Sequence, residues 1–525
     1  MDIEPAELAR RIWAKDPAVW IQGGTGAAAK DIADRLGWLR VASNMESKTA
    51  DLSAFAREIK DAGFTRVLLL GMGGSSLAPL VFRRVCGTPS GIEMEVADTT
   101  DPVAVRALGT GVDLSKTLFL FSSKSGGTIE VDSLFRHFYG AVGGAGAQFV
   151  AITDPGTGLE KLAKEKKFRR TFLNPPDIGG RFSALSYFGL VPAALIGVDV
   201  AVLLGRAVRM MRECDLSAPG KNPGLQLGLA MGGAWAKGRD KVTLVADPGL
   251  EPLGLWVEQL VAESTGKDGR GIVPVALEPL GGPDVYSGDR LFVSVSMRDD
   301  SAIEGKLAAL EGAGHPVIRI RMKDALDLGA EFFRWEFATA VAGAMLGINP
   351  FDQPNVQEAK VKTREALAEL EATGKLPDPP SGDPARGVMD ALASLTPGKD
   401  YIALLAFLPY DPAIEKAMRE LQAGLRDRHK VAVTWGFGPR YLHSTGQLHK
   451  GGANNGVFFV FACGHGSDLP IPGVPFTFAQ LERAQALGDR ASLEGKGRRV
   501  TWLGLPDPSP ASVAGACACF KVNGN

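Results

Sequence analysis

The sequence predicts an α/β protein built from doubly wound parallel sheets. Short apolar runs end in Gly- or Ser-rich loops and are followed by helical patterns, as in RVLLLGMGGSSLAPLVF (66–82) and KTLFLFSSKSGGTIEVDSLFRHFYG (116–140). Strands that alternate with helices indicate parallel sheets with helices on both faces. With 525 residues, the chain is too long for one ordinary core, so we expect two to four packed units.

The first half of the chain shows this alternation from the N-terminus. Apolar spacing predicts helices at 5–14, 27–38 and 46–62, and the first buried strand follows at 66–70. A second strand begins near 116 and leads to a helix from Thr128, and a third strand is expected at 148–155. The long apolar stretch 182–205 contains Gly189, Pro192, Gly197 and Asp199. These breaks favour two buried helices over a membrane span.

The second half continues the pattern in two further series. Strands are expected at 241–247, 290–297 and 315–322, with helices at 253–265, 302–312 and 328–346. After a Pro- and Gly-rich linker at 375–387, strands are expected at 401–409, 430–436, 456–464 and 498–505, with a helix at 412–426. The C-terminal strands echo those of the second series, which suggests a partial repeat. The expected division is N-terminal helices at 1–45, α/β units at 46–205 and 206–375, and a C-terminal α/β unit at 388–525.

Composition and charge narrow the class of protein. Lys and Arg number 58 against 59 Asp and Glu, which argues against a nucleic-acid partner. No run of about 18 apolar residues occurs, so no membrane partner is expected, and the N-terminus lacks a signal-peptide core. The five scattered cysteines fit reduced thiols in a cytoplasm, and the C-x-C at Cys517 and Cys519 lacks further ligands nearby. We therefore expect a cytoplasmic protein without a metal or other cofactor.

The loop Ser122–Thr128 is the clearest chemical feature. It lies between a strand end and a helix start, where free N–H groups and the helix dipole favour an anion. Its hydroxyls and two glycines are suited to surround a phosphate, although the segment is not a Walker loop. The alternative is an ordinary Ser-capped turn, and the side chain of Lys124 could equally face solvent.

Four other segments carry candidate chemistry. The loop Gly71–Ser76 also follows a strand, so it is expected to line one crevice together with the loop Ser122–Thr128. The alternative is that its glycines serve only tight packing between a helix and a strand. Arg181 is a candidate for stabilising an oxyanion, or a helix-end charge. Glu263 is a candidate general base, or a helix C-terminal charge. Gln353 and Lys360 would share a face if a helix joins them, or form a polar surface.

Together, these segments resemble the glucose-6-phosphate isomerase family. GMGGSSL, SSKSGGTIE, GGRFS, AESTGK and NPFDQPNVQEAK follow the family's order between residues 66 and 360. The resemblance implies two sugar-isomerase (SIS-type) domains, at 46–205 and 206–375. FGPRYLHSTGQLHKGG and PFTFAQLERAQALGD resemble the isomerase part of bifunctional transaldolase/glucose-6-phosphate isomerases. Since no transaldolase barrel fits before residue 66, we expect the isomerase alone.

The family's ring-opening histidine is absent from its usual place. No His occurs in IVPVALEPLGGPDVYSGDRLF, which follows Glu263, yet an H-S-x-G-Q motif appears at His443–Gln447. The hypothesis is that the C-terminal unit folds back and delivers His443 to the site, where ordinary family dimers use a partner's histidine. His449 is a second candidate. The resemblance leaves both a monomer and a homodimer open.

The implied reaction is the interconversion of glucose 6-phosphate and fructose 6-phosphate. The resemblance implies that Glu263 is the base, Arg181 stabilises the enediolate, and His443 with Lys360 opens the ring. Contacts with the phosphosugar are implied for Gly73, Ser75, Ser123, Lys124, Ser125, Thr128 and Gln353. The alternatives are a sugar-phosphate-binding regulator of the same fold, an isomerase that also accepts mannose 6-phosphate, and a structural subunit of a larger complex.

Overall fold

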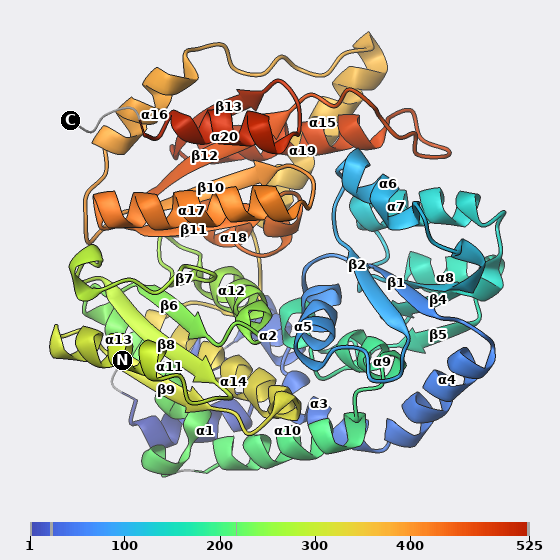
Figure 1. Cartoon of the computed structure of the whole chain (residues 1–525). Helices are drawn as coiled ribbons and strands as arrows, with labels where there is room; N and C mark the ends of the chain where they lie inside the picture. The colour runs from blue at the N-terminus through green and yellow to red at the C-terminus, as the bar shows by residue number, and fades with distance from the viewer. Residues whose placement is uncertain (1–2, 22–24, 217, 522–525) are drawn as a thin grey trace.

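The computed structural model describes residues 3–21, 25–216 and 218–521, and its strands form three parallel sheets (Figure 1). The strand orders are β2-β1-β3-β4-β5, β7-β6-β8-β9 and β11-β10-β12-β13. In each sheet, the first strand of the unit lies between the second and the third, so the chain winds outward in both directions. This arrangement confirms the predicted α/β class with doubly wound parallel sheets.

The first unit follows four N-terminal helices. These are α1 (Pro5–Trp13), α2 (Gly26–Ala33), α3 (Trp38–Glu46) and α4 (Thr49–Asp61). The helix expected at 27–38 is wrong at its C-terminal end, because the chain leaves α2 after Ala33 and Leu36 forms a bridge with Ile178. The sheet and its helices are β1 (Arg66–Leu70), α5 (Leu77–Cys86), β2 (Glu93–Ala97), α6 (Pro102–Gly109), β3 (Thr117–Ser122), α7 (Ile129–Ala141), β4 (Phe149–Thr153), α8 (Gly158–Glu165) and β5 (Arg170–Leu173).

Two strands of this sheet have no counterpart among the predicted elements. Strands β2 and β5 form its two edges, and each mixes exposed with buried positions. The predicted strands β1, β3 and β4 are buried at every position. A continuous apolar run marks a strand that is covered on both faces, whereas a short edge strand lacks that signal.

Two buried helices follow the first sheet, as expected for 182–205: α9 (Tyr187–Leu195) packs on α4 and α5 of the first unit, and α10 (Val200–Cys214) packs on the long buried helix α14 (Leu328–Leu346) of the second. The other elements of the second unit are α11 (Pro223–Ala236), β6 (Lys241–Ala246), α12 (Glu251–Thr265), β7 (Val273–Val275), β8 (Arg290–Ser296), α13 (Ser301–Gly312) and β9 (Val317–Arg321). The carboxylate of Asp199 accepts hydrogen bonds from Ala201 N–H (3.1 Å) and Val202 N–H (3.0 Å), which starts α10 there. Among the described residues, no helix combines the length and apolarity that crossing a membrane requires.

The third unit packs on both of the others. Its elements are α15 (Val356–Thr373), α16 (Pro384–Ala393), β10 (Tyr401–Phe407), α17 (Pro412–His429), β11 (Ala432–Phe437), α18 (Gly446–Gly451), β12 (Gly456–Cys463), α19 (Phe478–Gly495), β13 (Arg499–Leu505) and α20 (Pro510–Ala518). Helix α15, although inside the range expected for the second unit, packs on α19 (Figure 1). The third sheet shares its strand order with the second. A common origin of these two units stays a prediction.

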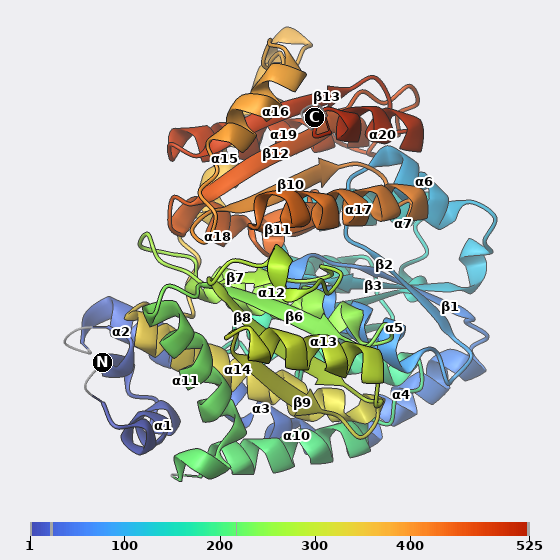
Figure 2. The same cartoon turned by 60° about the vertical axis from the view of Figure 1, so that its left-hand side comes forward.

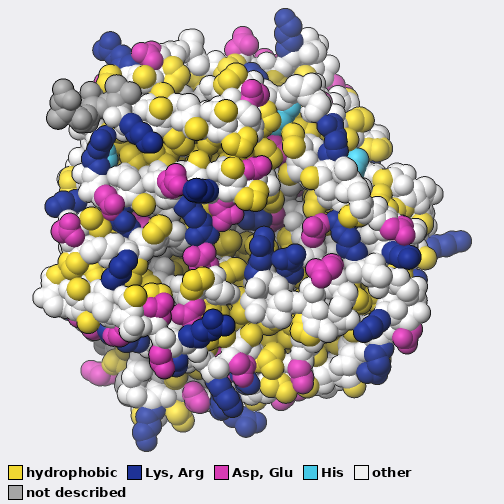
Figure 3. All heavy atoms as spheres, viewed as in Figure 1, with side chains coloured by type: hydrophobic (Ala, Val, Ile, Leu, Met, Phe, Trp, Pro, Cys, Tyr) yellow, Lys and Arg dark blue, Asp and Glu magenta, His cyan; other side chains and the backbone are white. Residues whose placement is uncertain are grey.

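Two apolar clusters hold the third unit in place. One joins residues of α12 and β7 to the third sheet, α18 and α19, and the other joins the first sheet and α7 to α15 and α19. Figure 2 shows the third sheet stacked above the second, with α18 next to α12 at the junction. Because buried apolar area stabilises such contacts, the three units share one packed body. On the face in Figure 3, acidic and basic side chains are interspersed, in keeping with 58 Lys and Arg against 59 Asp and Glu.

Glu336 is a buried carboxyl group on α14, in the core of the protein. Its side chain is fully buried, neither carboxylate oxygen has a partner among the described residues, and burial raises its pKa well above the ordinary value. Above about pH 4.5 the unfolded chain releases this proton while the folded chain retains it, so stability falls as pH rises. We expect Glu336→Leu to stabilise the protein by about 1–3 kcal/mol at neutral pH, with the gain increasing between pH 4.5 and 8.

Thermal unfolding followed by circular dichroism across this pH range measures the effect. Glu371→Leu, on an exposed position of α15, is the matched control and should not show a gain that grows with pH. A Glu336→Leu protein that melts at or below the wild-type temperature at pH 8 would contradict the prediction.

Candidate active site

The predicted phosphate loop connects β3 to α7 at the carboxyl edge of the first sheet. The hydroxyl of Ser123 accepts a hydrogen bond from Gly126 N–H (3.1 Å) and lies 3.4 Å from the hydroxyl of Thr128. Ser125 accepts from Gly127 N–H at 3.4 Å. Thr128 is the residue before α7 and makes no side-chain cap, so its hydroxyl does not satisfy the first N–H groups of the helix. The loop therefore combines hydroxyls with a helix N-terminus, as an anion site requires.

Lys124 points elsewhere in this structure. Its ammonium group forms an ion pair with the carboxylate of Asp154 and donates to the carbonyl of Pro176 at 3.2 Å. Of the loop residues predicted to contact substrate, Ser125 and Thr128 line a pocket, whereas Ser123 and Lys124 do not. Lys124 is held by Asp154 and Pro176, which is neither the predicted substrate contact nor the alternative of a side chain that faces solvent.

The second Gly-rich loop runs directly beside the phosphate loop. The hydroxyl of Ser122 donates to the carbonyl of Ser75 at 3.2 Å, so the two loops are joined. Gly73 has φ +54°, and a Cβ atom there would come within 2.7 Å of the Gln259 amide and 2.8 Å of the His443 carbonyl. Gly73 is therefore a point where the backbone of the third unit, at His443, comes close to the backbone of the first.

Arg181 and Glu263 form the charged centre between the first two units. The guanidinium group of Arg181 lies 3.2 Å from the carboxylate of Glu263, and it donates to the hydroxyl of Ser264 (2.7 Å) and the amide oxygen of Gln353 (3.1 Å). Two backbone carbonyls of the 350–352 segment accept at 2.6 and 2.9 Å. Burial lowers the pKa of Arg181, and the charge of Glu263 opposes that effect. These contacts fix the guanidinium in one orientation.

The turn that carries Gln353 is held by Lys267. The ammonium group of Lys267 donates to the carbonyl of Asn349 (2.7 Å) and to the carboxylate of Asp352 (2.6 Å). Burial and the nearby charge of Arg181 lower its pKa to about 8. Lys267, part of the AESTGK segment, thus anchors the 349–352 backbone below the site.

No single helix joins Gln353 to Lys360, so the condition under which they would share a helix face is not met. Helix α15 begins at Val356, so Gln353 lies in the preceding turn and is held by Arg181. Lys360 lies on the first turns of α15 and lines the same pocket as Thr128. Among the described residues, its ammonium group has no hydrogen-bond or ion-pair partner, so its charge acts on the pocket.

His443 reaches this pocket from the third unit of the same chain. It ends the short 3₁₀ helix η9 (Arg440–His443), and its Nε2 lies 2.9 Å from the carboxylate of Glu130 on α7. The same carboxylate oxygen accepts from the amide of Gln485 on α19 at 2.7 Å. Burial opposes ionisation of Glu130, but the charges of His443 and Lys360 and the hydrogen bond from His443 outweigh it and lower its pKa. Glu130 is therefore a carboxylate that orients His443.

A bridge from Gln259 connects His443 to Glu263. The amide nitrogen of Gln259 donates to the carboxylate of Glu263 (3.1 Å) and to the backbone carbonyl of His443 (2.8 Å). The second predicted candidate, His449, is buried and packs its ring on Tyr441 and Phe458 instead of facing the pocket. The structure thus places His443, and not His449, beside the other predicted side chains.

The pocket itself has a volume of about 220 Å³. Its lining includes Ser125, Gly127, Thr128, Glu130, Lys360 and His443. Sequence reasoning missed Glu130, Gln259 and Gln485. Glu130 carried one signal, since it lies within the quoted SSKSGGTIE segment as an acid in the first turn of a helix. Gln485 carried none, because its partner Glu130 lies 355 positions away. Gln259 lies one turn before Glu263 on α12, but its contact with the carbonyl of His443, 184 positions away, had no signal in the sequence.

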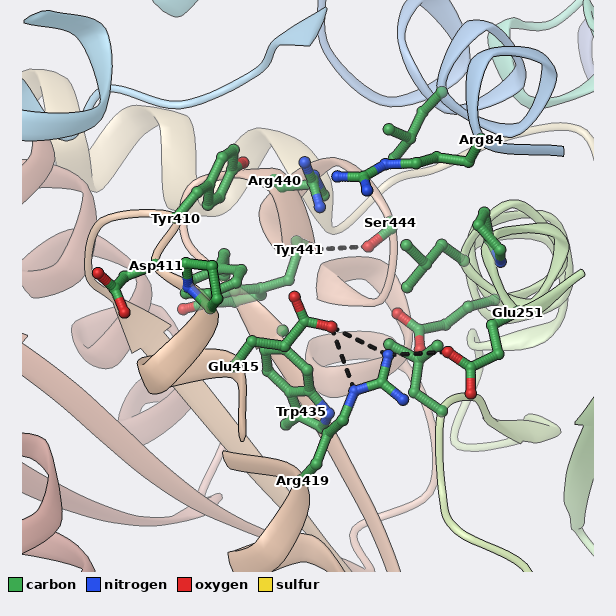
Figure 4. Close-up of a pocket in the computed structure, with 18 of the residues that line it drawn as sticks. Arg84, Glu251, Tyr410, Asp411, Glu415, Arg419, Trp435, Arg440, Tyr441 and Ser444 are labelled. Atoms are coloured by element: carbon green, nitrogen blue, oxygen red, sulfur yellow. Dashed lines mark hydrogen bonds and ion pairs between the residues drawn. The ribbon is translucent and has the colours of Figure 1, made fainter. Parts of the chain in front are cut away.

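A larger cavity of about 450 Å³ lies on the other side of η9. Figure 4 shows Arg419 bound between Glu415 and Glu251, with Tyr410 and Arg440 on the far wall. Glu258 also lines it, and burial raises the pKa of Glu258 to about 8, although Arg440 opposes the shift. Among the described residues, those predicted for the site do not line this cavity. Its size alone therefore does not identify the active site.

Comparison with known proteins agrees with this arrangement. The family model described as phosphoglucose isomerase matches residues 45–272. A glucose-6-phosphate isomerase of Rubrobacter xylanophilus is 31% identical over 410 residues, which span 65% of this chain and 94% of the relative. One of Parabacteroides distasonis is 29% identical, over 65% of this chain and 88% of the relative.

Solved structures support the same fold. A glucose-6-phosphate isomerase from Chlamydia trachomatis superposes with a TM-score of 0.57 at 20% identity, covering 74% of this chain and 87% of that one. A hypothetical protein from Thermus thermophilus gives a TM-score of 0.59 at 25% identity, covering 69% of this chain and 94% of that one. The 31% identity with the Rubrobacter relative, over 94% of its length, and the matching family model show that the chain belongs to the glucose-6-phosphate isomerase family.

Proposed function

We propose that this chain interconverts glucose 6-phosphate and fructose 6-phosphate and assembles its whole active site from one chain. The supporting observation is that the phosphate loop, Lys360 and His443 line one pocket, while Gln259 connects the backbone of His443 to Glu263. In this proposal, the third unit supplies the histidine that ordinary family dimers take from a partner.

Each side chain has a separate role in the proposed reaction. Ser123, Ser125 and Thr128 anchor the phosphate, so that binding energy remote from the reacting carbons positions the sugar. His443, oriented by Glu130 and assisted by Lys360, moves the proton that opens the ring. Glu263 then carries a proton between C1 and C2 of the open chain.

Arg181 has the electrostatic part of the mechanism. Proton removal next to a carbonyl produces an enediolate, whose negative charge needs a fixed donor. The guanidinium group of Arg181 lies 3.2 Å from Glu263 and is held by Ser264 and Gln353, so it needs no rearrangement when the charge forms. Glu263 and Arg181 thereby act as a base and an electrostatic partner side by side.

A coupled assay tests the proposal directly. Fructose 6-phosphate is supplied to the purified chain, and glucose 6-phosphate is detected by its dehydrogenase through NADPH absorbance. Turnover supports an isomerase, whereas tight binding without turnover would support the sugar-phosphate regulator instead. A parallel reaction with mannose 6-phosphate tests whether the substrate range is broader.

Gly73→Ala tests the close approach of the third unit. The added Cβ would clash with the Gln259 amide and the His443 carbonyl, and φ +54° is unfavourable for Ala. We expect kcat/KM to fall about 100-fold, because a displacement of about 1 Å in the backbone of His443 misplaces its ring. Steady-state kinetics measure the loss.

Gly233→Ala, a helical glycine with open space around its Cβ position, is the matched control and should retain wild-type kcat/KM. Far-UV circular dichroism should show that both variants fold. Wild-type kinetics in folded Gly73→Ala would mean that this approach is not needed for activity.

A further inference from the structure

Three potential metal ligands meet where the third unit contacts the first, outside the active site, and a cysteine lies beside one of them. Asp101 precedes α6, Cys463 ends β12, His465 follows it, and Glu482 lies on α19. One ligand atom each from Asp101, His465 and Glu482 lies within 4.8 Å of the other two. Asp101 belongs to the first unit, whereas His465 and Glu482 belong to the third unit, more than 300 positions later in the sequence.

The cluster is buried and its polar groups are incompletely paired. The side chains of Asp101, His465 and Glu482 are 0%, 3% and 3% exposed. One Asp101 oxygen accepts from Ala104 N–H at 2.7 Å, but the other, Oδ2, has no hydrogen-bond partner among the described residues. This orphaned Oδ2 points toward His465 Nε2 at 3.8 Å. Oε1 of Glu482 is also buried without a partner among the described residues. Buried oxygens without donors indicate a missing cation or proton.

The charges in the cluster point to a cation. Among the described residues, no Lys or Arg side chain pairs with Asp101 or Glu482, so two carboxyl groups share one imidazole. In the part of the chain that the structure describes, two buried carboxyl groups this close together lack a balancing positive charge. A divalent ion would allow both groups to ionise, because it would balance two negative charges at once.

The distances around His465 Nε2 are close to the spacing of ligand atoms in a zinc site. Zn²⁺ bonds of about 2.0–2.3 Å to nitrogen, oxygen and sulfur place neighbouring ligand atoms about 3.3–3.7 Å apart. In this structure, His465 Nε2 lies 2.7 Å from Glu482 Oε2, 3.8 Å from Asp101 Oδ2 and 3.8 Å from Cys463 Sγ. Cys463 Sγ lies beside His465 but outside the three ligand atoms that are within 4.8 Å of one another, so it would have to move to become a fourth ligand.

We propose that Asp101, His465 and Glu482 form a Zn²⁺ site that fastens the third unit to the first, with Cys463 as its fourth ligand. A fourth protein ligand would close the coordination sphere, as in structural rather than catalytic zinc sites. Binding would displace the protons of the carboxyl groups and the thiol, so affinity should increase with pH.

The site would also support the active site indirectly. Glu482 and Gln485 lie three positions apart on α19, and Gln485 donates to Glu130, which holds His443 at 2.9 Å. Residues three apart on a helix lie on one face. A metal that fixes this part of α19 would therefore fix the hydrogen bond that orients His443.

Metal content and thermal stability test the proposal without an activity assay. The full chain is treated with a chelator, dialysed, and titrated with Zn²⁺ against a chromophoric competitor. We expect one tightly bound Zn²⁺ per chain and a higher Tm when it is present. His465→Gln should lose this uptake and the Tm increase, whereas His137→Gln, a half-buried histidine on α7 outside the cluster, should keep both.

Cobalt substitution tests the sulfur ligand separately. The Co²⁺-loaded protein should show a thiolate-to-cobalt charge-transfer band, and Cys463→Ser should lose the band while still binding metal through the other three ligands. A band that persists in Cys463→Ser would overturn the assignment of the thiol. Absence of stoichiometric Zn²⁺ uptake, or uptake that His465→Gln leaves unchanged, would overturn the site, whatever the coupled isomerase assay shows.

Discussion

Replacing Glu263 by Gln is expected to lower kcat about 100- to 10,000-fold while leaving the affinity for a phosphosugar nearly unchanged. An amide cannot accept the proton from carbon, so the proposed step between C1 and C2 stops. Gln still offers an oxygen to Arg181, which lies 3.2 Å from the carboxylate, so the buried guanidinium group keeps a partner. Steady-state kinetics with fructose 6-phosphate measure kcat, and titration with sorbitol 6-phosphate, which has no carbonyl, measures affinity.

The neighbouring residue Glu258 provides a matched control on the same helix. It undergoes the same chemical change in Glu258→Gln, yet it lines the larger cavity on the other side of η9 (Figure 4). We expect Glu258→Gln to retain kcat within about two-fold, since the group lies outside the proposed machinery. If Glu263→Gln kept most of its turnover while binding normally, Glu263 would not be the base.

The parts of the site that lie close together in sequence could be predicted from it. The phosphate loop requires only a buried strand, a Ser/Gly turn and a helix, which occur within residues 117–141. Family motifs predict Arg181, Glu263 and Lys360. Lys360 lines the pocket, and Glu263 pairs with Arg181 and accepts a hydrogen bond from Gln259. Local physics and motif order were sufficient here, because each motif brings its own turn or helix end.

The parts that depend on docking between units could not be predicted. Glu130 and His443 are 313 positions apart, and Glu130 and Gln485 are 355 apart. The spacing of apolar residues along the chain predicts neither pair. Both pairs form only when apolar residues of α15 and α19 pack on the first sheet. The pairing of Lys124 with Asp154 could not be predicted either, although both residues belong to the first unit. Asp154 lies at the end of the next strand, and nothing in the sequence indicates this ion pair.

The third unit therefore has a specific structural task. It repeats the strand order of the second unit, packs on both other units, and brings η9 into contact with Gly73. In a dimeric enzyme, a histidine from a partner is lost when the subunits separate. A histidine supplied by the same chain stays next to the phosphate loop at any protein concentration, so the proposed activity per chain should not depend on dilution.

His443→Gln is expected to separate ring opening from isomerisation. With fructose 6-phosphate, which is mostly cyclic, kcat/KM should fall about 100- to 10,000-fold, because no group moves the ring proton. With 5-deoxyfructose 6-phosphate, which lacks the hydroxyl that closes the furanose ring, the loss should be at least about ten-fold smaller. Both rates are measured by exchange of the C1 proton with deuterium from the solvent, followed by NMR.

The comparison between the two substrates also defines the role of Glu130. If Glu130 acts by orienting His443 at 2.9 Å, then Glu130→Gln should show the same selectivity for the open-chain substrate with a smaller loss. A general loss of packing would instead slow both substrates equally. His137→Gln, on the same helix but outside the pocket, should slow neither. Equal losses on the two substrates in His443→Gln would remove the ring-opening role and leave His443 as a binding residue.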